Sequence, residues 1–165
     1  MKQKLLMFVL GAICCSWLAA AQAAAPSPQF LGTWEMDLSK TDPQPPPTGD
    51  PKTTPKSVTV TVKDAGGGKW SSELVNEMAD GTKYPQPATT FNLDGTPSPA
   101  TGDVTLVVTF PDPSTAVVTA VQNGQPVSTE TYKLSADGKQ MVSVLDTIGP
   151  DGNPFHMTQT YNKKK

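Results

Sequence analysis

The sequence predicts an all-β protein, folded as a single antiparallel up-and-down β-barrel of about eight strands after an N-terminal signal-peptide helix. Three observations support this fold class. Apolar and polar residues alternate along most of the chain, Asn-Gly and Asp-Gly pairs separate the alternating segments, and an apolar leader precedes them. We expect a signal peptide at residues 1–23 and one barrel domain at residues 24–165, including a proline-rich connector at residues 41–56.

The leader has the pattern of a secretory signal. Two lysines precede an apolar run that is shorter than the about 20 residues of a membrane-spanning helix, and the small-x-small tripeptide Ala21–Ala23 ends it. We therefore expect cleavage near Ala23 and a periplasmic or secreted protein. Lipid anchoring at Cys14 or Cys15 is the alternative. With cleavage near Ala23 the mature chain contains no cysteine and folds without disulfides.

The mature chain begins with one short strand and a proline-rich segment. The first strand lies within "FLGTWEMDLSK", residues 30–40, where Gly32 and Trp34 form a Gly-x-Trp pattern. Residues 41–56 contain six prolines, which exclude a helix or a central strand because proline lacks the backbone N–H. This composition is typical of an extended surface connector, or of a segment that docks in an aromatic groove.

In the rest of the chain, apolar and polar residues alternate with a period of two, as they do in half-buried strands. In "SVTVTVK", Val58, Val60 and Val62 share one face, whereas threonines and a lysine occupy the other. The predicted strands after the connector are residues 57–63, 69–78, 88–93, 104–110, 115–122, 126–134, 139–148 and 155–163.

Short turns join these strands. Asp80-Gly81, Asn123-Gly124 and Asp137-Gly138 suit tight hairpins, because both residues of such pairs tolerate positive φ. Strands joined by hairpins form an antiparallel meander, and closing the meander into a barrel removes its exposed edges. The interior of an eight-stranded barrel is either filled by side chains or just large enough for one small ligand. The alternation alone leaves both possibilities open.

Four segments together resemble a largely uncharacterised group of exported bacterial proteins described as lipocalin-like. They are "GTWEMDLSK" (32–40), "PKSVTV" (55–60), "SADGKQMVS" (135–143) and "GPDGNP" with the later "YNK" (149–163), and the likeness covers nearly the whole mature chain. The Gly-x-Trp pattern is also similar to the first strand of lipocalins and fatty-acid-binding proteins. This resemblance implies that Gly32 and Trp34 form a structural plug at one end of the barrel.

The chain departs from those families in two ways. Lipocalins place an arginine over the tryptophan, but this chain contains no arginine, so Lys133 or Lys163 would have to replace it. Fatty-acid-binding proteins have two helices after the first strand, where this chain has its proline-rich connector.

No catalytic constellation stands out in the sequence. His156 is the single histidine and alternates with apolar neighbours, so we expect it to point outward. A set of Ser143, His156 and Asp146 lacks the Gly-x-Ser-x-Gly elbow. The carboxylate pairs Glu73–Glu77 and Glu35–Asp37 fit solvated outer faces, and turn chemistry accounts for Asp151 and Asn153. We expect no enzyme activity, no metal site and no cofactor.

The net charge of the chain argues against nucleic acid as a partner. Without the two leader lysines the formal net charge falls from −2 to −4, and every cation of the chain is a lysine. An acidic, arginine-free chain is a poor candidate for binding nucleic acid. The three-lysine C-terminus fits a solvated tail.

We therefore predict an exported binding protein that takes a small hydrophobic or amphipathic molecule into the barrel. The predicted ligand-binding residues are Trp70, Leu106, Met141 and Phe155. Suitable polar partners inside the barrel are Thr129, Thr131, Ser143 and Gln159. The alternative is an envelope structural or interaction protein with a filled barrel. A void lined by the first three of the predicted ligand-binding residues distinguishes the two functions.

Overall fold

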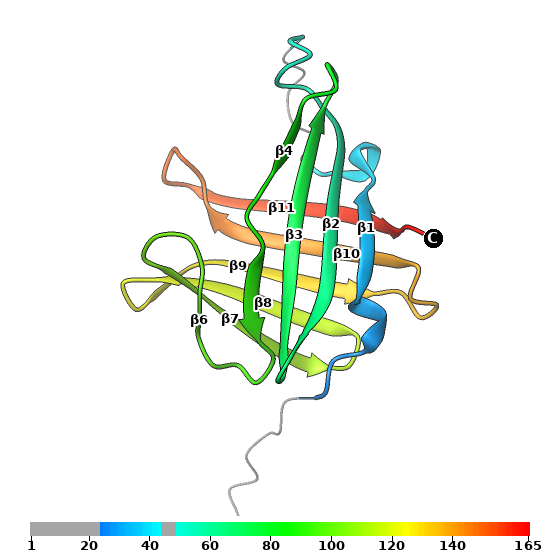
Figure 1. Ribbon diagram of the computed structural model, residues 1–165. Coiled ribbons are helices and arrows are strands. Elements are labelled where there is room, and N and C mark those ends of the chain that lie inside the picture. The colour runs from blue at the N-terminus through cyan, green and yellow to red at the C-terminus, as the bar shows by residue number, and fades with distance from the viewer. Residues whose placement is uncertain (1–23, 44–48) are drawn as a thin grey trace, which may run out of the picture.

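The computed structural model describes residues 24–43 and 49–165 of the 165-residue chain (Figure 1). The predicted signal peptide, its cleavage near Ala23 and the alternative at Cys14 or Cys15 lie outside the described residues. Within the described ranges, no helix is both long and apolar enough to cross a membrane.

Strands make up most of the described chain, and its helical elements are two single-turn 3-10 helices. The sequence contains long β-branched alternating segments, which favour strands over helices. The elements in chain order are η1 (Pro28–Phe30), β1 (Gly32–Met36), η2 (Leu38–Lys40), β2 (Pro55–Gly66), β3 (Lys69–Met78), β4 (Lys83–Pro85), β5 (Thr89–Asn92), β6 (Ser98–Pro99), β7 (Val104–Asp112), β8 (Thr115–Gln122), β9 (Gln125–Leu134), β10 (Gln140–Ile148) and β11 (Pro154–Lys163).

All the strands belong to one antiparallel sheet. Its order is β4-β3-β2-β1-β11-β10-β9-β8-β7-β6, and β5 also pairs with β3. The first strand, β1, lies between β2 and the last strand, β11. In Figure 1, β1 to β3 run upright in front of β7 to β11, which run across the view. The predicted all-β, antiparallel, up-and-down arrangement is confirmed.

The prediction of about eight strands closed by hydrogen bonds is wrong in detail. The sheet has eleven strands, and its ends, β4 with β5 and β6, are not joined by a strand ladder. We call the gap between these two ends of the sheet the seam. Prolines explain it, because residues 85, 87, 97 and 99 are proline and have no backbone N–H to donate to a strand ladder. A side-chain bond crosses the seam instead: the Asn92 backbone N–H donates to the Ser98 hydroxyl over 2.8 Å.

Side chains alternate between the inside and the outside of the barrel, as the sequence predicts. Trp34 on β1 pairs with Val60 on β2, which pairs with Leu74 on β3, and these three side chains face inward. Of the three predicted turn pairs, Asn123 and Gly124 both have positive φ, at 51° and 75°, whereas at Asp80-Gly81 and Asp137-Gly138 only the glycine does. The buried core is the cluster of Phe30, Trp34, Trp70, Val108, Phe110, Ala116, Leu134, Met141 and Tyr161.

The first described residues of the predicted connector pair with β11. Asp42 forms two backbone hydrogen bonds with Thr158 of β11, of 2.9 and 2.7 Å. A turn at residues 50–54 follows, and β2 already begins at Pro55, inside the predicted connector range. No α-helix occurs in the described residues between β1 and β2.

Candidate functional site

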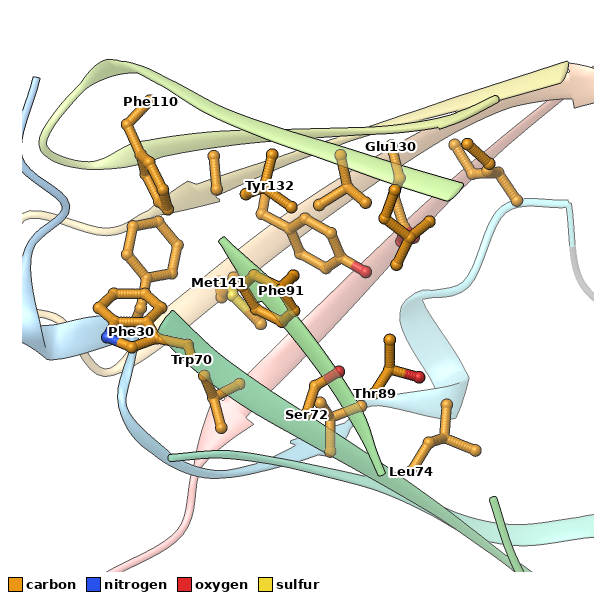
Figure 2. A pocket seen from close by; sticks show the side chains of 18 of the residues that line it. Phe30, Trp70, Ser72, Leu74, Thr89, Phe91, Phe110, Glu130, Tyr132 and Met141 are labelled. Atoms are coloured by element: carbon orange, nitrogen blue, oxygen red, sulfur yellow. The ribbon is translucent and has the colours of Figure 1, made fainter. Parts of the chain in front are cut away.

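The two crossing groups of strands enclose a cavity of about 330 Å³. This volume lies at the lower end of the about 300–1,000 Å³ that is usual for small-molecule sites. Most of its wall is apolar, and it receives side chains from both sides of the seam (Figure 2). The lining residues are Phe30, Val60, Val62, Trp70, Ser72, Leu74, Thr89, Phe91, Leu106, Val108, Phe110, Ala116, Val118, Ala120, Ser128, Glu130, Tyr132, Met141 and Leu145.

Three aromatic rings form one end of the cavity, which we call the aromatic floor: Phe30, Trp70 and Phe110. Their centroids lie 5.8 to 6.2 Å apart, and the ring planes are inclined at 51° to 74°. Edge-on contacts at these distances are a favoured aromatic geometry. Figure 2 shows the three rings gathered together at one end of the cavity. Because they come from η1, β3 and β7, they close the barrel across the gap between the two groups of strands.

Trp34 lies beyond this floor and is fully buried. Its indole Nε1–H donates to the carbonyl oxygen of Phe30 over 2.8 Å, which ties the floor to β1. The Lys163 ammonium lies 5.0 Å from the centre of the Trp34 ring. Lys163 therefore holds the place over the tryptophan, whereas Lys133 points outward on β9 and is exposed. Lys163 also passes close to Gly32, where a Cβ would lie 3.1 Å from its Cε.

Polar groups occupy the middle and the far end of the interior. Glu130 and Tyr132 face the cavity from β9, and Figure 2 shows the Tyr132 hydroxyl directed toward the end where Glu130 lies. Beside them, the Tyr161 and Ser143 hydroxyls both donate to Gln159 Oε1, over 3.0 and 3.2 Å. The interior therefore combines an apolar wall with a small polar network.

Both interior tyrosines are held in the neutral form. Burial raises the pKa of Tyr132 well above its ordinary value, and the charge and hydrogen bonding of Glu130 raise it further. Burial also raises the pKa of Tyr161, again with a contribution from the charge of Glu130. Removal from water disfavours the phenolate, and a nearby carboxylate adds like-charge repulsion. Both phenols therefore remain hydrogen-bond donors at neutral pH.

The structure brings three of the four predicted ligand-binding residues together. Trp70, Leu106 and Met141 line the cavity, whereas Phe155 does not. Phe155 pairs with Thr147 and so has the same inward orientation as Met141 on β10, but it lies where β11 extends past the cavity, and it is 37% exposed. The structure does not bring Phe155 into the cavity, because alternation fixes the face of a residue and not its position along the barrel axis.

Of the four predicted polar partners, two face the interior of the barrel and two do not. Ser143 and Gln159 face the interior, but Thr129 and Thr131 alternate with the lining residues of β9 and point outward. Glu130, Tyr132 and Phe30 also line the cavity, although they are not among the predicted site residues. The alternation in "PVSTETYKL" could have identified the first two, since they share a face with Leu134 of the buried core. Phe30 lies two residues before Gly32 and four before Trp34, so the same period of two could have pointed to it, although the structure places it in η1.

His156 and Asp146 form a pair on the outer face. The His156 Nδ1 lies 2.7 Å from an oxygen of Asp146, and both side chains are more than 60% exposed. Ser143, in contrast, is fully buried in the interior, so these three residues do not form a catalytic set. Among the described residues, no group of three or more His, Cys, Asp or Glu side chains is placed to hold a metal ion.

The predicted carboxylate pairs lie on the outside. Glu77 forms ion pairs with Lys56 and Lys83, at 2.6 and 3.5 Å. The hydrogen bond from Lys56 lowers the pKa of Glu77. Glu35 pairs with Lys164 at 2.5 Å. These carboxylates have lysine partners near solvent, which is the arrangement of a charged outer face.

Comparison with known proteins gives a likeness in fold. No family model and no curated protein matches the chain. It is similar to the wild-type fluorescent protein UnaG (15% identity, TM-score 0.52, covering 82% of this chain and 98% of that chain). It is similar to the zebrafish ileal bile acid-binding protein complexed with cholic acid (12% identity, TM-score 0.50, covering 82% of this chain and 99% of that chain). It is also similar to As-p18, an extracellular fatty acid binding protein (14% identity, TM-score 0.51, covering 85% of this chain and 99% of that chain). The chain thus has the β-barrel fold of these proteins over most of its length.

Proposed function

We propose that this protein is a binding protein that takes a small hydrophobic or amphipathic molecule into the barrel. The observation that carries the proposal is the apolar cavity of about 330 Å³ above the aromatic floor. Apolar side chains around a cavity favour an apolar guest, at about 0.8 kcal/mol for each methylene removed from water. Binding of this kind includes no covalent step. We therefore propose a binding protein and not an enzyme.

The similar structures support this assignment. Two of them are named as binding proteins for a bile acid and for fatty acid, both of which are amphipathic molecules. The cavity weighs against the alternative of an envelope structural or interaction protein with a filled barrel, because filled barrels leave no such space. The leader pattern at residues 1–23 supports a periplasmic or secreted location, and the lipocalin-like exported group remains our proposal for its relatives.

The test is to express the full chain, purify the protein, extract it with organic solvent and identify the released compounds by mass spectrometry. The control is a variant in which the cavity is filled. Leu106 points into the cavity from β7, so Leu106→Trp should exclude a guest. Val107 is its neighbour on the same strand and pairs with Thr119 on the outer face, which makes Val107→Trp the matched variant.

We expect a bound compound in the wild type and in Val107→Trp, and a loss of at least tenfold in Leu106→Trp. The same series is then repeated with added amphiphiles, using tryptophan fluorescence, because Trp70 lies in the cavity wall. An empty wild-type protein with no response to any amphiphile would falsify the assignment. Equal loading of the two tryptophan variants would place the compound outside the cavity.

A further inference from the structure

The cavity wall contains one charged side chain, Glu130. Its other lining residues are apolar or carry a neutral hydroxyl, and no lysine is among them. Glu130 projects from the middle of β9, opposite Val118 on β8 and Leu145 on β10, both of which also line the cavity. A carboxylate is thus set into a wall whose nearest cross-strand neighbours are apolar.

Within the described part of the chain, Glu130 has no cationic partner. The ion pairs there involve Glu35, Asp37, Glu77, Asp137 and Asp146, and none includes Glu130. The groups facing it are the phenols of Tyr132 and Tyr161, which can donate a hydrogen bond but carry no positive charge. The chain also has no arginine, the usual cation for a semi-buried carboxylate.

The hydrogen bond with Tyr132 offsets part of the cost of placing the Glu130 carboxylate against an apolar wall, but it leaves the negative charge without a cation to balance it. The same carboxylate repels an anion placed in the same small space. We propose that the ligand supplies the missing charge, so that the cavity selects amphiphiles that carry a protonated amine over those that carry a carboxylate. This inference rests on the proposed function, because it concerns the occupant of the same cavity.

The shape of the cavity suits such a molecule. The aromatic floor gives an apolar tail a surface at one end, and Glu130 lies toward the other end (Figure 2). The Tyr132 ring lies between them and can receive an ammonium group through a cation–π contact in addition to the ion pair. The guest would therefore bind tail-first against Phe30, Trp70 and Phe110, with its amine at the carboxylate.

The test compares three probes with the same tail: decylamine, decanol and decanoate. Each is titrated at neutral pH, below its micellar concentration, into the full chain and followed by calorimetry and by tryptophan fluorescence. We expect decylamine to bind about tenfold or more tightly than decanoate, with decanol between them. This comparison uses the wild type alone, so it holds even where a variant fails to fold.

Two variants then separate the site from the overall acidity of the protein. Glu130→Gln keeps the side-chain shape and should reduce the preference for decylamine over decanoate by about tenfold. Glu73→Gln removes the same charge from the outer face of β3, where Glu73 alternates with the lining residues Ser72 and Leu74. It should leave the preference unchanged.

The outcomes distinguish this inference from the function on which it rests. If decanoate or decanol binds as tightly as decylamine, or if the two glutamine variants behave alike, the amine preference is wrong and the binding function stands. If none of the three probes binds to the wild type, the proposed function fails with it. A preference for decylamine that disappears only in Glu130→Gln supports the proposal.

Discussion

The two ends of the barrel interior differ in how completely they are filled. At the closed end, Trp34 is 0%, Phe110 is 1% and Phe30 is 5% exposed, and the Phe30 and Phe110 rings contact each other with centroids 6.2 Å apart. Further along, the inward-facing side chains Ala120 and Ser128 are small and border the cavity. One sheet with one alternation therefore has a solid end and a hollow end.

The size of the inward-facing side chains accounts for this difference. The inward row of β8 is Ala116, Val118 and Ala120, and the facing row of β9 ends in Ser128. These residues cannot reach across the interior as a tryptophan or phenylalanine does. Periodicity thus decides which side chains enter the barrel, and their volumes decide whether they meet.

The largest expected effect is the contrast between truncation at the two ends. Trp34→Ala should lower the free energy of unfolding by about 3–5 kcal/mol, because it removes a fully buried aromatic ring and its hydrogen bond to Phe30. Leu106→Ala borders an existing void, so it should cost about 2 kcal/mol, the low end for a leucine truncation. Chemical denaturation of both variants measures the difference. Equal losses would mean that the cavity collapses in solution.

A smaller effect concerns the hollow end at alkaline pH. Burial and the Glu130 carboxylate raise the pKa of Tyr132 in the folded state, so the unfolded chain loses the phenolic proton first as the pH rises. The stability linked to Tyr132 is thus fully present below the unfolded pKa of about 10 and declines above it. Between pH 8 and pH 11, Tyr132→Phe should gain about 1 kcal/mol relative to the wild type.

Denaturation curves for the two proteins at a series of pH values measure this gain. The comparison between them removes the titration of the lysines, which both proteins share. A constant difference between wild type and Tyr132→Phe across that pH range would contradict the burial of the phenol.

The sequence was sufficient for the strands and their orientation but not for the cavity. Alternation and turn residues predicted β2, β3 and β7 to β11 to within a few residues, because both signals are local. The alternation also placed the side chains of Trp70, Leu106 and Met141 on the inward faces of their strands. Whether a void lies between them depends on side chains from strands far apart in the chain, and no local pattern reports that distance.

The differences between the predicted and observed interior residues also have local causes. Thr129 and Thr131 have suitable chemistry, but they alternate with the inward-facing Glu130 and Tyr132. The period of two along β9 therefore favours Glu130 and Tyr132 as interior residues. The seam at β5 and β6 was harder to foresee, since prolines indicate where pairing fails but not which strands remain unpaired.

The smallest expected effect separates the two lysines that could lie over Trp34. Lys163 is 5.0 Å from the ring centre and donates to the Gln29 carbonyl oxygen over 2.6 Å. Lys163→Met keeps an apolar contact but removes the charge, and should lower the free energy of unfolding by about 0.5–1 kcal/mol. Lys133→Met, on the exposed outer face of β9, is the matched control and should cause no measurable change. A larger loss in Lys133→Met than in Lys163→Met would show that the ammonium over the indole does not stabilise the closed end.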